Sequence, residues 1–288
     1  MSDEHKKIGR NEKCWCGSGL KYKKCHLNST NKPPVTEYEL NKTFKDSYRK
    51  KYCSVPDILK GECENKISEA HSVARSFLRK ISQDGHVYAF NLSSPSITIK
   101  NRGKIELKKI GINDASIFTG FCSKHDDSIF KNIEKNNDFK GSKEECFLHA
   151  YRTLCMEYFN RQCSIDFSNS NIITKLYSGR TPSEQMFLQK NNAQYKAGLN
   201  VGMNYLKKYK SDFDNMLESK DFDNFNSLVL KFEKIPTVMA SGMTKPIYDF
   251  NGNFIQDLRN LKITPVDIYY NTFFFRRLWL CYFFLDGN

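Results

Sequence analysis

The chain lacks the long apolar runs of membrane proteins, since no stretch approaches the ~18 uninterrupted apolar residues that a membrane-spanning helix needs. Its first residues, MSDEHKKIGRNEKCWC, also lack the apolar centre of a secretory signal peptide. The sequence shows neither a glycine-rich phosphate-binding loop nor the serine nucleophile elbow of hydrolases. We therefore expect a cytoplasmic protein with no membrane partner.

Acidic residues are in short supply, with 32 Asp and Glu against 45 Lys and Arg, which gives a formal net charge of +13. The composition is otherwise that of a folded protein, with 39% hydrophobic and 14% aromatic residues. A positive field of this size attracts polyanions and suits DNA, RNA or an acidic protein partner. A Lys-rich composition also arises from genome base composition, so charge alone does not identify the partner.

Ten cysteines are present in this chain without an export signal. Because a reducing cytosol disfavours disulfides, clustered cysteines there indicate metal binding first and redox chemistry second. The first cluster lies in residues 9–26, GRNEKCWCGSGLKYKKCH, and its members are Cys14, Cys16, Cys25 and His26. Three thiolates and an imidazole suit tetrahedral zinc, and four protein ligands leave no open position for a substrate. The spacing predicts a structural zinc knuckle.

This segment closely resembles the SEC-C motif, first known from the C-terminal tail of the SecA preprotein translocase. The matching positions are Cys14, Cys16, Gly17, Ser18, Gly19, Lys21, Tyr22, Lys23, Cys25 and His26. Lys13 and Trp15 stand where prolines are usual, but every ligand is kept. The resemblance implies a zinc-bearing interaction module, which in SecA contacts a chaperone and the ribosome. A protein partner through the knuckle is therefore one expectation.

A second constellation lies between residues 53 and 126 and consists of Cys53, Cys63, Cys122 and His125. A pair of cysteines followed by Cys-x-x-His at a helix start is the ligand arrangement of a treble-clef zinc finger. The helix is predicted to begin near Cys122 and to run to about Lys135. The sequence thus predicts a second zinc site.

Residues 53–130 also resemble HNH nucleases of the treble-clef kind. The resemblance implies that His71 is the general base that activates water and that Asp126 binds a catalytic Mg²⁺ or Mn²⁺ ion. Ala70 stands where these enzymes place a second His or an Asp, and the spacing of Cys53 and Cys63 is wider than usual. A relic that binds nucleic acid without cutting it fits as well.

Periodicity offers a different interpretation of the same region. Apolar residues recur at helical spacing over 67–81, with Ser68 as N-cap, so that His71 would be a core histidine or a zinc ligand in an amphipathic helix. Three further cysteines, Cys146, Cys155 and Cys163, are interpreted as buried thiols of one helix. His149 is expected on the surface of that helix.

The whole pattern predicts an α+β fold. Five parts follow: a zinc knuckle (1–27), a linker (28–36), a mixed zinc-finger-like or HNH-like region (37–140), a helical middle (141–234) and a small antiparallel sheet (235–288). Helices are predicted over 143–163 and from Thr181 to about Lys234. Strands are predicted over 86–92, 97–100, 104–110 and 263–285, with a hairpin turn at Asn251-Gly252.

Two functions remain open on the sequence. One is a zinc-binding SEC-C motif protein associated with nucleic acid, with an HNH-like metal-dependent nuclease as its enzymatic form. The other is a non-catalytic adaptor whose knuckle docks on a chaperone, a ribosome or another protein.

Overall fold

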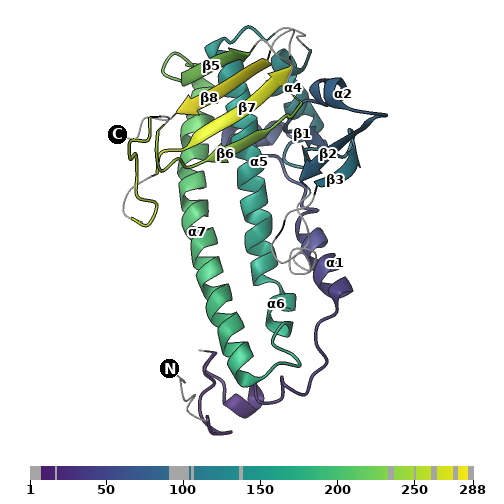
Figure 1. Cartoon of the computed structure of the whole chain (residues 1–288), viewed down its shortest axis with the longest axis vertical. Helices are drawn as coiled ribbons and strands as arrows, with labels where there is room; N and C mark the ends of the chain where they lie inside the picture. The colour runs from purple at the N-terminus through teal and green to yellow at the C-terminus, as the bar shows by residue number, and fades with distance from the viewer. Residues whose placement is uncertain are drawn as a thin grey trace. The chain divides into compact units, whose positions relative to one another are not determined.

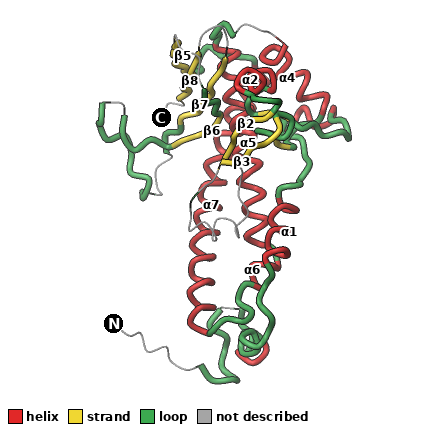
Figure 2. Tube along the Cα trace, turned by 45° about the vertical axis from the view of Figure 1, so that its right-hand side comes forward, coloured by secondary structure: helices red, strands yellow, loops and turns green. Residues whose placement is uncertain are grey.

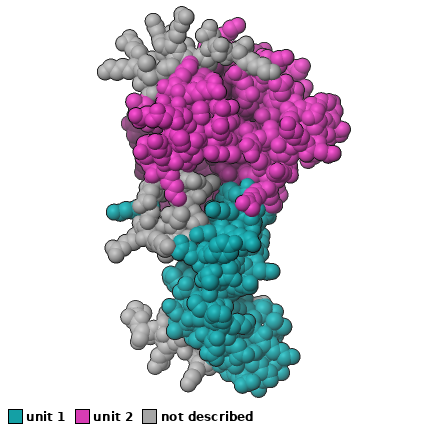
Figure 3. All heavy atoms as spheres, turned by 90° about the vertical axis from the view of Figure 1, so that its right-hand side faces the viewer, with its two compact units in different colours: residues 1–48, 92–105, 162–201 teal, residues 49–91, 106–161, 202–288 magenta. Residues whose placement is uncertain are grey.

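The computed structural model describes residues 8–16, 18–90, 104, 107–135, 139–232, 237–249, 251–260, 265–274 and 278–284. It confirms an α+β protein in which helices combine with small antiparallel sheets (Figure 1, Figure 2). The chain forms two compact units, built from residues 1–48, 92–105 and 162–201 and from residues 49–91, 106–161 and 202–288 (Figure 3). The five-part division expected from the sequence stays a prediction.

The described part of unit 1 consists of helices and loops. It contains η1 (Tyr22–Lys24), α1 (Glu37–Ser47), α6 (Asn171–Lys175), the end of α5 (Lys143–Asn169) and the start of α7 (Pro182–Ser219). A capping box begins α1, because Thr36 Oγ1 accepts from the Glu39 amide at 3.2 Å and the Thr36 amide donates to Glu39 Oε2 at 3.0 Å. The core of this unit joins Leu40 of α1 to Phe167 of α5 and to Ile172 of α6.

The described residues of unit 2 form three antiparallel sheets. Strands β1 (Ala70–His71) and β4 (Ile117–Phe118) form one pair, and β2 (His86–Phe90) and β3 (Leu107–Gly111) form a second. The third sheet has the order β5-β8-β7-β6. Its strands are β5 (Asn226–Phe232), β6 (Ser241–Thr244), β7 (Ile268–Phe274) and β8 (Leu278–Phe284). This sheet confirms the predicted small C-terminal β region.

Helices of unit 2 enclose an aromatic core. They are η2 (Asp57–Glu62), α2 (Arg75–Ile81), α4 (Ser123–Lys135) and the remaining parts of α5 and α7. Phe147 stacks on Phe213 with ring centroids 5.3 Å apart, and Phe213 contacts Tyr269 of β7 at 5.4 Å. Each such pair adds to the burial of large apolar rings. These ring contacts hold α5, α7 and β7 together at the centre of unit 2.

The helix predicted from Thr181 to about Lys234 is wrong at its C-terminal end. Helix α7 stops at Ser219, the next residue has a positive φ of 53°, and the chain continues as β5. β5 forms because residues 226–232 pair along their whole length with β8, which lies about fifty residues further along the chain. Sequence periodicity carries no information on that long-range pairing.

Shorter elements show a mixed outcome. The predicted strands 86–92 and 104–110 appear as β2 and β3, whereas 97–100 lies outside the described residues. Gly252 has a φ of 83° in the predicted hairpin turn, and Tyr248 bridges to Phe254. The helix alternative for 67–81 is wrong in its first half, because residues 70–71 form β1 and the helix starts only at Arg75.

Candidate metal centres

The zinc knuckle brings its four predicted ligands together. The donor atoms of Cys14, Cys16, Cys25 and His26 all lie within 4.8 Å of one another. Sγ of Cys14 lies 3.3 Å from His26 Nδ1, and Sγ of Cys25 lies 3.1 Å from the same nitrogen. A tetrahedral zinc ion with bonds of about 2.3 Å to sulfur and about 2.0 Å to nitrogen separates its ligands by about 3.5–3.8 Å. The set therefore fits one zinc ion after small adjustments.

Local backbone geometry produces this arrangement. The Cys14 amide donates to the Leu20 carbonyl at 2.7 Å, which closes the loop between the first two cysteines and η1. Gly19 occupies the left-handed region with φ 74°, where a side chain would be strained. Cys25 and His26 directly follow the 3₁₀ turn η1, which places them beside the first two cysteines.

Electrostatics at the knuckle are consistent with metal binding. Burial raises the pKa of Cys14 to about 12, so this thiol is protonated at neutral pH without an ion. At Cys16 burial also acts to raise the pKa, but hydrogen bonds from Ser18 outweigh it and the pKa lies below its usual value. Burial and nearby Lys32 lower the pKa of His26, which keeps the imidazole neutral for coordination.

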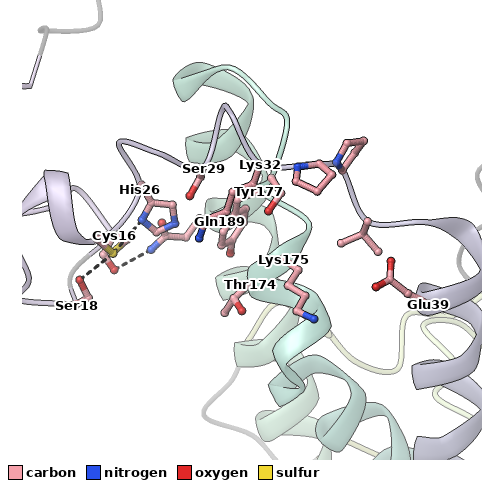
Figure 4. Close-up of a pocket in the computed structure, with 15 residues that line it drawn as sticks. Cys16, Ser18, His26, Ser29, Lys32, Glu39, Thr174, Lys175, Tyr177 and Gln189 are labelled. Carbon is pink, nitrogen blue, oxygen red and sulfur yellow. Dashed lines mark hydrogen bonds between the residues drawn. The ribbon is translucent and has the colours of Figure 1, made fainter.

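The knuckle rests on the helical part of its own unit. The His26 ring lies 4.6 Å from Trp15 and 5.3 Å from Tyr177, and Gln189 Nε2 donates to the Cys16 carbonyl at 2.8 Å. Between these parts lies a cavity of about 660 Å³ (Figure 4). Its lining includes Cys16, Ser18, His26, Lys32, Glu39, Thr174, Lys175, Tyr177 and Gln189. The metal site thus forms one wall of a pocket.

The structure also brings the second set together. The donor atoms of Cys53, Cys63, Cys122 and His125 lie within 4.8 Å of one another. His125 Nδ1 is 3.1 Å from Cys122 Sγ, 3.5 Å from Cys63 Sγ and 3.6 Å from Cys53 Sγ. These separations suit a single tetrahedral ion as well as those of the knuckle do.

Three separate pieces of backbone position these ligands. Cys53 lies in the loop between α1 and η2, Cys63 directly follows η2, Cys122 directly precedes α4, and His125 lies in the first turn of that helix. The Ser54 amide donates to the Gly120 carbonyl at 2.8 Å, and the Ser68 amide donates to the Phe121 carbonyl at 2.9 Å. These bonds join the two halves of the site across a wide sequence separation.

Cysteine pKa values differ within the second set. Burial raises the pKa of Cys53 to about 12. Burial also acts to raise the pKa of Cys122, but backbone hydrogen bonds at His125 and Glu64 outweigh it and lower the value. The amides of a helix start favour negative charge, which suits the Cys122 thiolate to metal binding.

His71 and Asp126, the residues that the HNH resemblance singles out, have their own partners. His71 lies on β1 with Nδ1 3.0 Å from the Ala115 carbonyl oxygen. Because a carbonyl only accepts, Nδ1 must carry the proton and Nε2 is the basic nitrogen. Asp126 accepts from Ser68 Oγ at 3.0 Å and from Arg152 Nη2 at 3.2 Å.

Arg152 is the residue that sequence reasoning missed. Its side chain is 3% exposed, and its guanidinium contacts Asp126, Glu134 at 2.7 Å and the His71 carbonyl oxygen at 3.3 Å. The guanidinium carbon also lies 4.0 Å above the Phe130 ring. An arginine inside the apolar face of α5 was the available signal, because a buried cation needs anionic partners. The Asp126 carboxylate is therefore already bound to a cation.

The remaining cysteines and His149 have other surroundings. Cys146, Cys155 and Cys163 are fully buried on α5 and belong to no metal-ligand group among the described residues, as their interpretation as core thiols requires. The prediction that His149 lies on the helix surface is wrong, since it is 6% exposed. In this part of α5 the polar side chains are therefore buried as well as the apolar ones.

Comparison with known proteins identifies one segment. Residues 10–28 match the family model of the SEC-C motif, so the chain carries this motif and is a zinc-binding SEC-C protein. No curated protein and no solved structure shows significant similarity to the chain. Within the described residues, every helix is too short or too polar to cross a bilayer.

Proposed function

We propose that this chain is a two-zinc protein that associates with nucleic acid, and that zinc organises its fold without taking part in catalysis. The carrying observation is the second cluster, which joins the loop of Cys53 and Cys63 to the first turn of α4 in a chain of net charge +13. Zinc-organised helices in a basic chain suit a polyanionic partner.

Closure of both sites supports a structural role for the metal. Each set offers three thiolates and one imidazole, which complete a tetrahedral shell. A catalytic zinc keeps one position for water or substrate, and these sets leave none. Zinc binding would instead supply folding free energy, above all to the knuckle, which is too short to have a core of its own.

The test measures zinc content and nucleic-acid affinity on the full chain. We expect two zinc ions per chain by elemental mass spectrometry, and oligonucleotide binding that weakens linearly with the logarithm of salt concentration. A chain with two zinc ions and no affinity for DNA or RNA at low salt would contradict the nucleic-acid part. A chain with one zinc ion would contradict the two-site part.

An HNH-like nuclease is the second candidate, and the position of His71 favours it. Its basic Nε2 and a pKa that burial holds below the usual value suit a proton acceptor. Against this stands Arg152, which occupies the carboxylate that a Mg²⁺ or Mn²⁺ ion would need. The geometry therefore supports binding more strongly than cleavage.

Plasmid cleavage with added Mg²⁺ or Mn²⁺ separates the two candidates. Cleavage abolished by His71→Ala and by Asp126→Ala, but kept by Asp127→Ala, would establish the nuclease. Asp127 is the matched control, because it is the neighbouring carboxylate on α4 and is exposed. Intact plasmid under conditions where the protein binds it would support the non-catalytic function.

The adaptor alternative has its own observation, the cavity of about 660 Å³ beside the knuckle. A pocket that a zinc module helps to wall offers a place for a segment of a protein partner. Zinc-dependent binding to purified ribosomes or a purified chaperone, lost in Cys16→Ser, together with no affinity for oligonucleotides, would favour this alternative.

A further inference from the structure

The two-stranded ribbon β2–β3 exposes an unusual face. Tyr88 is 70% exposed, Phe90 is 71% exposed, and Leu107, which lies directly opposite Phe90, is 54% exposed. Residues two apart on a strand share a face, so these three apolar side chains form one surface. Single exposed apolar residues are ordinary, whereas an adjacent group that includes two aromatic rings marks an interaction site.

Positive charge accompanies these rings. Lys109 lies opposite Tyr88 in the same register, on the same face of the ribbon, and is exposed. Neither β2, with the sequence HVYAF, nor β3, with the sequence LKKIG, contains an acidic residue. An aromatic surface with a cationic side chain beside it complements a chain of phosphates that carries flat bases.

The spacing of the rings distinguishes single strands from duplexes. Tyr88 and Phe90 are two residues apart, which corresponds to about 6.8 Å along an antiparallel strand. Successive nucleotides within a duplex strand rise by only about 3.4 Å. The rings therefore match the bases of an extended, unstacked strand, and duplex bases are in any case stacked on each other.

We propose that the exposed face of the β2–β3 ribbon is a binding site for single-stranded nucleic acid, with bases stacking on Tyr88 and Phe90 and a phosphate contacting Lys109. The inference rests on the proposed association with nucleic acid and names the surface that carries it. The opposite face of the ribbon contains Val87, which is 7% exposed, so that face is the buried one.

The experiment measures fluorescence anisotropy of labelled dT20, rU20 and a 20-base-pair duplex with the zinc-loaded full chain. Loss of one stacking ring lowers single-strand affinity by about 5- to 150-fold, so we expect this from Tyr88→Ala and from Phe90→Ala. Tyr88→Phe keeps the ring and should keep the affinity. Tyr38→Ala is the matched control, because Tyr38 is 74% exposed but lies on α1.

Lys109→Gln gives a second readout, which packing changes would not reproduce. Removing one phosphate contact lowers the slope of log affinity against log salt by about 0.7 for a single strand. The dT20 and rU20 arms show whether the site prefers DNA or RNA. Circular dichroism and an unchanged zinc content establish that each variant is folded.

Three results would overturn the proposal, and they differ in what else they overturn. If the wild type binds, and Tyr88→Ala and Phe90→Ala have the same affinity as the control Tyr38→Ala, the ribbon is not the binding site. The proposed association with nucleic acid would still stand. Failure of the wild type to bind any of the three oligonucleotides removes both. Concentration-dependent dimerisation that is lost in Phe90→Ala, without oligonucleotide binding, assigns the ribbon to contact with a second copy of the chain.

Discussion

Replacing Cys122 by serine is the sharpest test of the second metal site. Cys122 is fully buried, its Sγ lies 3.1 Å from His125 Nδ1, and a serine hydroxyl is a poor zinc ligand beside two thiolates. We expect the zinc content to fall from two ions to one per chain. The knuckle in unit 1 should keep its ion, because it shares no ligand with the second set.

The size of the stability change follows from the length of chain that the second ion closes. A cross-link over about 60 residues, the separation of Cys63 from Cys122, stabilises the folded state by about 4 kcal/mol in the chain-entropy description. A link over about 10 residues, such as that between Cys16 and Cys25, stabilises by about 3 kcal/mol. Cys122→Ser should therefore lower the stability of unit 2 by about 4 kcal/mol, and Cys16→Ser should have the smaller effect on unit 1.

Elemental mass spectrometry and differential scanning calorimetry read the two consequences separately. A loss of about 4 kcal/mol corresponds to a Tm lower by about 8–16 °C in a unit of this size. Cys146→Ser is the control, because it removes a fully buried thiol of the same unit that belongs to neither ligand set. It should keep two zinc ions.

Three outcomes would refute the reasoning. A wild-type chain with one zinc ion would show that the second set binds no metal. Two ions retained by Cys122→Ser would show that the ion is held by other residues. Equal Tm changes in Cys122→Ser and Cys146→Ser would show that the loop-closure argument is wrong even where the ion is lost.

Three further predictions concern other parts of the chain. Arg152→Met leaves the carboxylates of Asp126 and Glu134 without their cation, so urea denaturation should show unit 2 destabilised by about 3–5 kcal/mol, with partial recovery on adding Asp126→Asn. Thr36→Ala removes the cap of α1 and should destabilise unit 1 by about 1 kcal/mol in the same assay. Burial holds the pKa of His149 well below 6.5, so unfolding takes up a proton below about pH 6.5. The free energy of unfolding should therefore decrease as the pH is lowered, by up to about 2 kcal/mol between pH 6.5 and pH 5. His149→Leu should flatten that part of the stability profile; a profile unchanged from wild type would contradict the assignment.

The knuckle was predictable because all its determinants are local. Its four ligands lie in one short segment, and Gly19 supplies the positive φ that the loop between them needs. All four residues of the second set were also predicted, but from a weaker signal. Cys122 and His125 have the Cys-x-x-His spacing of a helix start, but nothing in the sequence near Cys53 shows that it meets them.

Arg152, His149 and β5 show what the sequence could not provide. The carboxylate partners of Arg152, Asp126 and Glu134, lie on α4, and they meet the guanidinium only when α4 and α5 are packed together. His149 is buried because α5 packs on more than its apolar face, where Thr153 and Glu145 are also buried. β5 depends on pairing with β8. In each case a contact with a distant part of the chain determines the environment of the residue or strand, and local sequence periodicity does not reveal such contacts.

The chain order of the second metal site and the ribbon leads to a final prediction. Strands β2 and β3 lie in the sequence between Cys63 and Cys122, so an ion bound by both cysteines holds both ends of the segment that carries the ribbon. Releasing that ion frees the segment and raises the entropy that nucleic-acid binding must remove. Cys122→Ser should therefore weaken dT20 binding, while Cys16→Ser, which also lacks one zinc ion, should bind as wild type does. Equal weakening in both variants would show that the two ions act through overall stability, and an unchanged affinity in Cys122→Ser would show that the ribbon needs no metal to hold its shape.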